Sequence, residues 1–198
     1  MFKFFKRMVP NAPSSTDLLD RAQGSLLGLA CGDAVGTTLE FSAPGSFERL
    51  NDMVGGGPFN LEAGQWTDDT SMALCLAESL LEDGFSPEGQ MNRYLKWFED
   101  GYLSSNGRFI DIGRTVREAL VEYRNTGNPL CGPLDEKTAG NGSIMRLCPV
   151  PLYFYPNLEN TIEYSELSSK TTHGTKECLD ACRCLSVLIY RVYQKKQF

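Results

Sequence analysis

Three features are scarce in this sequence: histidine, clustered basic residues and long apolar stretches. It has a single histidine, and its 19 Lys and Arg residues form no stripe that could follow a phosphate backbone. With a net charge of -6, we expect no direct binding to nucleic acid. The apolar stretch Leu26–Cys31 is far shorter than the ~20 residues that a bilayer-spanning helix needs, so we expect no membrane protein.

Cysteine is present, but in a pattern that argues against disulfides and zinc. The seven cysteines are odd in number and irregularly spaced, which favours reduced thiols in a cytoplasmic protein. Cys178, Cys182 and Cys184 lie near His173 in the sequence, so a zinc site is a minor alternative. The absence of any Cys-x-x-Cys pair weakens it, and three cysteines so close on one helix cannot all point the same way.

Residues 1–14 are predicted to form a flexible N-terminal arm, and residues 15–198 one helical domain. The arm opens with the basic and aromatic stretch Met1–Arg7 and lacks the apolar core of a signal peptide. Weak membrane contact by the arm is a minority alternative. A chain of 198 residues fits a single domain with a sizeable core.

Apolar residues recur with helical spacing along the chain, and no stretch alternates convincingly with period two. Helices are expected from Asp17 onward, over 67–83, from Pro87 until Gly101 ends it, directly after Asp111 with Gly127 past its end, over 158–168 and after Thr175. Pro149 and Pro151 divide the apolar run Leu147–Tyr155, so a kinked or restarted helix is expected there, ahead of the helix over 158–168. The sequence therefore predicts an all-α fold.

The first predicted helix carries a strip of small residues and one acid. Gly24, Gly28, Gly32 and Gly36 recur every four residues, so we expect another backbone to pack tightly against this face. Asp33 lies among these glycines in an apolar run. Because an unpaired buried acid is costly, a cation or a hydrogen-bond donor should lie nearby, with a salt bridge or a solvated helix end as the alternative.

Two adjacent acids, Asp68 and Asp69, follow Thr67 at the start of the second predicted helix. One interpretation is a helix cap, in which Thr67 or Asp68 accepts a free backbone N–H and the acids complement the helix dipole. The other is a cation site, because paired carboxylates on a rigid, buried helix are suitable ligands for a hard cation. The pair alone favours the cap.

A glycine-rich segment and the lone histidine form a second candidate site. Gly140-Asn141-Gly142-Ser143 follows a long polar connection, and small residues at a helix start leave backbone N–H groups open to an anion. A simple glycine-rich turn is equally compatible with this pattern. His173 precedes a helix beside threonines, which suits ligand contact, although a structural hydrogen bond is the commoner role for such a histidine.

Taken together, several stretches resemble the ADP-ribosylglycohydrolase family. The matching stretches are Gly24–Gly36 with Glu40-Phe41, Trp66–Thr70, Phe109–Gly113, Ala139–Arg146 and Thr172-His173. Five matches in the family's order are far more specific than any one of them.

The resemblance implies an all-α, orthogonally packed domain that binds two magnesium or manganese ions and cleaves the bond between ADP-ribose and an acceptor. It implies metal binding by Thr67, Asp68 and Asp69. It places Glu40 and, more weakly, Asp111 at the ribose, where carboxylates stabilise an oxocarbenium-like state. The implied substrate-binding residues are Gly140, Asn141, Gly142, Ser143 and His173.

The resemblance also has a gap, because family members are longer and complete their metal site with a late Asp-x-Asp-Thr motif that is absent here. The first hypothesis is the N-terminal part of a metal-dependent hydrolase acting on an ADP-ribosylated protein or small-molecule conjugate. The alternative is a catalytically inactive ADP-ribose-binding or structural relative, and a third is a phosphohydrolase using the same acids. In each case a partner chain is expected to cover the shortened C-terminal face.

Overall fold

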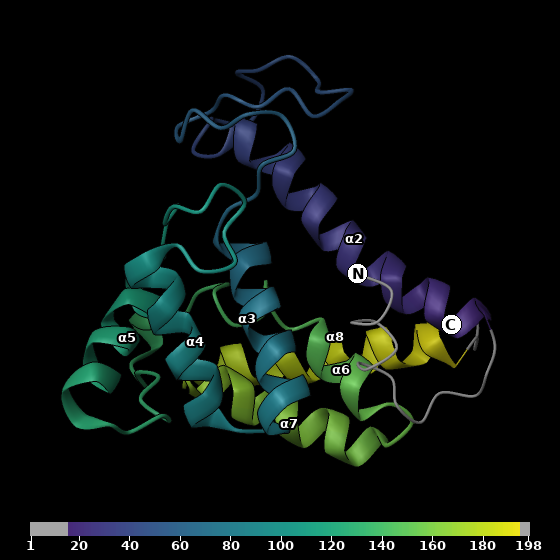
Figure 1. The fold of residues 1–198 in the computed structure, drawn as a ribbon, viewed down its shortest axis with the longest axis vertical. Coiled ribbons are helices and arrows are strands. Elements are labelled where there is room, and N and C mark those ends of the chain that lie inside the picture. The colour runs from purple at the N-terminus through teal and green to yellow at the C-terminus, as the bar shows by residue number, and fades with distance from the viewer. Residues whose placement is uncertain (1–15, 195–198) are drawn as a thin grey trace.

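The computed structural model describes residues 16–194 as an arrangement of helices joined by loops of different lengths (Figure 1). The predicted arm 1–14 lies outside the described residues. The elements are α2 (Thr16–Gly36), η1 (Thr37–Leu39), α3 (Asp68–Asp83), α4 (Pro87–Asp100), α5 (Arg114–Thr126), η2 (Glu136–Thr138), α6 (Pro149–Phe154), α7 (Leu158–Lys170) and α8 (Lys176–Tyr193). Within these residues the only β-pairing is an isolated bridge between Gly56 and Leu61. The predicted all-α fold is confirmed. No described helix combines the length and the apolar character required to cross a membrane.

Local signals determine where several helices begin and end. The Ser86 hydroxyl accepts a hydrogen bond from the Gly89 amide at 3.0 Å, and Pro87 occupies the first helical position of α4. Gly101 ends the same helix in the left-handed conformation, with φ 68°. Glycine adopts this conformation without steric cost. These features place α4 as the sequence predicted.

Helix α5 begins later than expected. The sequence predicted a helix that follows directly on Asp111, yet α5 starts at Arg114 with Gly113 before it. Asp111 itself has φ 54°, in the left-handed region that a right-handed helix excludes. The chain therefore turns at Asp111 before the helix begins.

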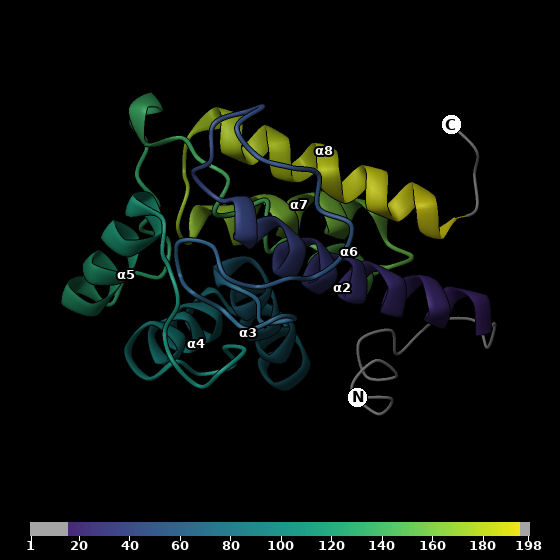
Figure 2. The same ribbon diagram turned by 90° about the horizontal axis from the view of Figure 1, so that it is seen from above.

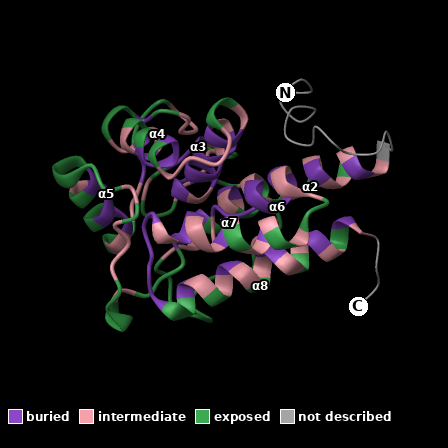
Figure 3. Ribbon diagram, turned by 90° about the horizontal axis from the view of Figure 1, so that it is seen from below, coloured by how far each residue is buried: buried purple, intermediate pink, exposed green. Residues whose placement is uncertain are grey.

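Helix α3 forms the centre of the fold. Met72, Cys75, Leu76 and Leu80 on it have no measurable exposure, as expected for a helix that neighbours enclose on most sides. α3 packs against α4, α6 and α2, and α7 lies alongside α8 (Figure 2). Figure 3 shows buried residues along α3 and exposed ones on the outer side of α5. The start of α3 is therefore held by a rigid interior.

The glycine strip on α2 does not pack against another backbone, so that prediction was wrong. A Cβ atom added to Gly24, Gly28, Gly32 or Gly36 would meet nothing within 4 Å, and all four glycines are exposed. The helix instead buries Leu18, Ala22 and Leu26 against α3, α6 and α8. Glycine spacing alone does not identify the packed face, because the neighbouring apolar residues offer more surface to bury.

The segment Gly140–Arg146 was expected to start a helix, and it forms consecutive turns instead. One helical-type bond joins the Met145 N–H to the Asn141 carbonyl at 3.0 Å. The next one is replaced, because the Gly142 carbonyl accepts a hydrogen bond from the Arg146 guanidinium at 2.6 Å. The helix restarts at Pro149 as α6, as the two prolines predicted.

Candidate active site at the start of helix α3

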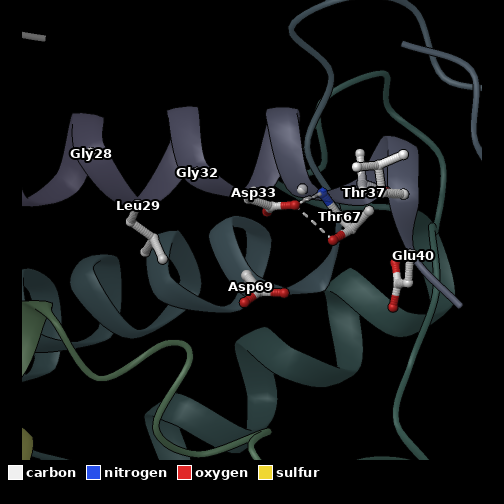
Figure 4. A pocket seen from close by; sticks show the side chains of 10 residues that line it. Gly28, Leu29, Gly32, Asp33, Thr37, Glu40, Thr67 and Asp69 are labelled. Atoms are coloured by element: carbon white, nitrogen blue, oxygen red, sulfur yellow. Dashed lines mark hydrogen bonds between the residues drawn. The ribbon is translucent and has the colours of Figure 1, made fainter. Parts of the chain in front are cut away.

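Helix α3 is capped by an acid from another helix. The carboxylate of Asp33 in α2 accepts hydrogen bonds from the N–H and hydroxyl of Thr67, at 3.0 and 2.8 Å. It also accepts from the N–H and hydroxyl of Thr70, at 3.0 and 2.7 Å. Figure 4 shows the Asp33 carboxylate pointing at Thr67 from the α2 ribbon. A charged acceptor at a helix N-terminus satisfies free amides and complements the helix dipole.

This contact corrects the cap interpretation of the acidic pair. Thr67 is the N-cap residue, yet its side chain accepts no hydrogen bond from α3. The helix-capping role belongs to Asp33, and the expectation of a hydrogen-bond donor beside this acid is confirmed. Asp68 and Asp69 do lie in the first turn of α3, as that interpretation also expected.

Carboxylates gather around this helix start and raise one another's pKa. Burial, and then the negative charges of Asp69, Asp111 and Asp33, raise the pKa of Asp68 to about 8. Burial and the charge of Asp33 raise the pKa of Asp69 to about 6. The pKa of Glu40 is also raised, by burial and then by Asp111 and Asp69. Such crowding of negative charge is typical of functional sites.

Two cavities flank the start of α3, and most of the predicted site residues line one or the other. The larger, of about 490 Å³, is lined by Asp33, Glu40, Thr67 and Asp69 together with exposed glycines of α2. Glu40 and Asp69 in Figure 4 lie on the two sides of Thr67. The smaller cavity, of about 140 Å³, is lined by residues that include Asp68, Gly140, Asn141, Gly142 and His173.

Two predicted residues line neither of these cavities. Ser143 is buried, and its hydroxyl bonds to the Ser169 hydroxyl at 2.9 Å and accepts from the Cys182 thiol at 3.5 Å. Asp111 acts on the site through its charge, which contributes to the raised pKa of Glu40 and Asp68. The roles predicted for both side chains at the substrate stay predictions.

The donor set suits a hard cation but does not enclose one. Among residues 16–194, no group of three or more His, Cys, Asp or Glu side chains converges as a metal-binding set. Mg²⁺ commonly takes one or two protein carboxylates and keeps several waters or substrate oxygens. Asp68 and Asp69 fit that pattern as part of a coordination shell. The described cysteines are all free thiols.

Arg146 is a buried residue of the site to which the sequence assigned no role. It has no measurable exposure, and its guanidinium carbon lies 4.7 Å above the ring of Tyr94. Its Nη2 donates to the hydroxyls of Thr171 and Thr172, at 3.0 and 2.8 Å. One sequence signal could have found it, because Arg146 is the only charged residue between Lys137 and Glu159.

Asp33 is the other residue without a role in the predicted site. The sequence marked it only as an acid of high burial cost. Its partners Thr67 and Thr70 lie more than thirty positions away, a separation that periodicity within one helix does not reveal.

These features define an α-helical domain with a cluster of acidic side chains at the start of its central helix, close to a cavity that a glycine-rich turn and a buried histidine also line. The family model for ADP-ribosylglycohydrolase matches residues 14–197. The chain belongs to the ADP-ribosylglycohydrolase family.

Curated relatives and a solved structure agree with this assignment. The chain is 47% identical over 173 residues to ADP-ribosylarginine hydrolase Tri1 of Pseudomonas putida (strain GB-1), covering 87% of this chain and 46% of that protein. It is 32% identical over 177 residues to ADP-ribosyl-[dinitrogen reductase] glycohydrolase of Rhodospirillum rubrum, and this match covers 87% of this chain and 58% of that protein.

The solved structure, described as an ADP-ribosylglycohydrolase-related protein complex, matches with a TM-score of 0.77 at 42% identity, over 88% of this chain and 56% of that chain. This chain thus spans about half the length of the curated relatives it matches.

Proposed function

We propose that this chain forms part of a metal-dependent hydrolase that releases ADP-ribose from ADP-ribosylated arginine side chains of proteins. Two relatives support the choice of acceptor: the Pseudomonas putida protein and one from Serratia proteamaculans (strain 568), 43% identical over 92% of this chain, are both named ADP-ribosylarginine hydrolase. The family assignment supports the bond that is cleaved.

The observation that carries this proposal is the set of carboxylates around the start of α3. Asp68 and Asp69 project from the first turn of a buried helix, and Glu40 and Asp69 line one cavity. Cleavage at an anomeric carbon develops positive charge on the ribose, which nearby carboxylates stabilise. A carboxyl group with a raised pKa can also hold or release a proton near neutral pH.

Each group of residues has a distinct task in this proposal. Glu40 and Asp111 act at the ribose, and Asp68 and Asp69, with the Thr67 oxygen, hold the cations. A bound Mg²⁺ or Mn²⁺ supplies Lewis acidity toward ribose and water oxygens. Gly140, Asn141, Gly142, Ser143 and His173 bind the remainder of the ADP-ribose group, because backbone N–H groups of a glycine-rich turn suit phosphate oxygens.

The cytoplasm is the proposed location, because seven free cysteines are compatible with a reducing compartment. An inactive ADP-ribose-binding relative is the competing function, although the named relatives above are hydrolases. The expected partner chain stays a prediction.

The test is release of ADP-ribose from a protein that carries ADP-ribosylated arginine, followed by mass spectrometry in the presence of Mg²⁺. We expect turnover by the wild-type chain and a loss of about a hundredfold or more in Asp69→Asn, in line with the contribution of positioned acids and bases. Asp20→Asn is the matched control, since Asp20 is an exposed acid near the start of α2.

Equal turnover by wild-type and Asp69→Asn chains would reject the mechanism. Calorimetric binding of ADP-ribose by the wild-type chain without turnover would support the inactive relative instead. Release of phosphate from nucleotides, without release of ADP-ribose, would favour a phosphohydrolase.

A further inference from the structure

Arg146 is a buried cation whose guanidinium bonds only to neutral groups. None of the carboxylates in residues 16–194 forms an ion pair with it; its partners are the Gly142 and Ser168 carbonyls and the hydroxyls of Thr171 and Thr172. Burial of a charge without an opposite charge is costly. The cost of burying this charge implies that the guanidinium has a role in holding its neutral partners in place.

One of those hydroxyls connects Arg146 to the lone histidine. The Thr172 Oγ1 lies 2.8 Å from Nη2 of Arg146 and 2.9 Å from Nδ1 of His173. A guanidinium only donates hydrogen bonds, so Thr172 must be the acceptor in the first contact. Both Thr172 and His173 are buried.

The second contact then determines where the imidazole carries its proton. Within the described residues, Nδ1 of His173 is the only acceptor bonded to the Thr172 hydroxyl. A buried hydroxyl proton without an acceptor costs free energy, so Thr172 donates to Nδ1. The ring proton of a neutral imidazole must then be on Nε2.

His173 lines the smaller cavity, and its Nε2 lies beside the glycine-rich turn. This nitrogen would lie 3.4 Å from a Cβ atom added to Gly140 and 3.3 Å from one added to Gly142. No described residue accepts a hydrogen bond from it, and His173, Gly140 and Asn141 line this cavity together. An Nε2–H group therefore offers a free donor beside the turn.

We propose that Arg146, acting through the Thr172 hydroxyl, holds His173 as the neutral Nε2–H tautomer, which donates a hydrogen bond to an oxygen of the ADP-ribose group bound in the smaller cavity. Arg146 is a positioning residue in this scheme. Its guanidinium also holds the Gly142 carbonyl at 2.6 Å, so one buried cation orients both the histidine and the turn opposite it. The choice of ligand rests on the proposed function.

The electrostatics agree with a neutral ring. Burial, and then the positive charge of Arg146, lower the pKa of His173 to about 3. A nearby fixed cation disfavours a second positive charge.

The tautomer can be measured directly, because the chain has one histidine and gives one set of imidazole signals. Full-length chain labelled with ¹⁵N-histidine is recorded in a two-bond ¹H–¹⁵N correlation experiment at neutral pH without ligand. We expect a protonated Nε2 and an unprotonated Nδ1. Signals from an Nδ1–H tautomer or from a doubly protonated ring would overturn the proposal.

Two substitutions separate the relay from general packing. Thr172→Val removes the hydroxyl and keeps the branched shape, and it should give the Nδ1–H tautomer or a mixture, while Thr172→Ser should retain Nε2–H. Thr171→Val is the matched control, because Thr171 also accepts from Arg146 but does not bond to His173. It should leave the tautomer unchanged, with circular dichroism verifying that each variant folds. An unchanged tautomer in folded Thr172→Val would overturn the proposal.

Calorimetry with ADP-ribose then tests the consequence for binding. We expect affinity to fall about tenfold in Thr172→Val, the loss of roughly one net hydrogen bond, and to recover in Thr172→Ser. Equal affinity in wild-type and Thr172→Val chains would contradict the donor role of Nε2–H. The expected tautomer in a chain that binds no ADP-ribose would reject the proposed ligand and leave the relay intact.

Discussion

The carboxylate of Asp33 in α2 accepts hydrogen bonds from both the N–H and the hydroxyl of Thr70 in α3, at 3.0 and 2.7 Å. The same carboxylate also binds Thr67. The contact fixes the first turn of α3 against α2, and that turn presents Asp68 and Asp69 to the two cavities. Asp33 is therefore a structural acid that supports the acids of the site.

The first prediction concerns this cap. Asp33→Asn replaces one carboxylate oxygen with an amide that donates, facing groups that also donate. We expect the free energy of unfolding to fall by about 2 kcal/mol, the usual range for losing hydrogen bonds to a charged partner. Urea unfolding of the wild-type and Asp33→Asn chains measures this difference in the free energy of unfolding. Asp20→Asn on the exposed side of the same helix should change little, and an equal effect of the two substitutions would contradict the capping role.

The Asp33 contact also shows which features of the fold could be predicted from the sequence and which could not. The bounds of α4 follow from signals within a few residues, namely Ser86 and Pro87 at its start and Gly101 at its end. The capping of α3 joins residues 34 and 37 positions apart, so it depends on how α2 lies across α3. Local patterns do not contain that information.

The candidate site was predictable to a similar extent. The residue pattern marked Asp68, Asp69 and the glycine-rich turn as candidates, and the family resemblance added Glu40. The division between two cavities, and the link from Arg146 to His173, depend on packing between α3, α7 and the turn. The left-handed backbone of Asp111 likewise follows from its surroundings, since aspartate adopts both conformations.

The second prediction concerns the exposed glycine strip of α2. Gly24→Ala should raise the free energy of unfolding by about 0.5–1 kcal/mol, because alanine favours the helix and nothing obstructs its Cβ atom. Chemical denaturation measures this. A matched opposite case is Gly57→Ala: Gly57 has φ 66°, and its Cβ would lie 2.7 Å from the Thr37 carbonyl, so this chain should be less stable. Destabilisation by Gly24→Ala would restore the tight-packing interpretation.

The third prediction separates the two glycines beside His173. A Cβ atom on Gly142 would lie 2.7 Å from both His173 Cε1 and Val116 Cγ2, whereas one on Gly140 has its nearest contact at 3.4 Å from His173 Nε2. Gly142→Ala should therefore lower stability by about 1–3 kcal/mol through overpacking, and Gly140→Ala by much less. Thermal unfolding of the two variants measures the difference. Equal effects would show that the His173 ring moves freely.

The fourth prediction concerns divalent cations. The carboxylates at the start of α3 repel one another, and a bound cation relieves that repulsion. We therefore expect Mg²⁺ or Mn²⁺ to raise the thermal midpoint of the wild-type chain, with chelation reversing the gain. Asp69→Asn should reduce the gain, and Asp20→Asn should retain it. A midpoint that does not respond to either cation in the wild-type chain would remove the support for a metal site.

The last prediction follows from the lowered pKa of His173. Burial and the charge of Arg146 lower it to about 3, against 6.5 for an ordinary histidine. Between about pH 3 and pH 6.5, His173 therefore binds a proton in the unfolded chain but not in the folded chain. The contribution of His173 to the free energy of unfolding is therefore fully present above pH 6.5. It falls as the pH drops toward 3, by about 1.4 kcal/mol per pH unit.

His173→Gln isolates this contribution, because glutamine keeps an N–H donor and does not titrate. Asp68, which lines the same cavity, and Asp69 titrate with the opposite sign, since their raised pKa values favour protonation of the folded chain. The informative quantity is therefore the difference in unfolding free energy between the two chains. The advantage of the wild-type chain should shrink between about pH 6.5 and about pH 5, measured by urea unfolding at each pH. A constant difference across that range would mean that His173 titrates alike in the folded and unfolded chains, and that Arg146 has no influence on its charge.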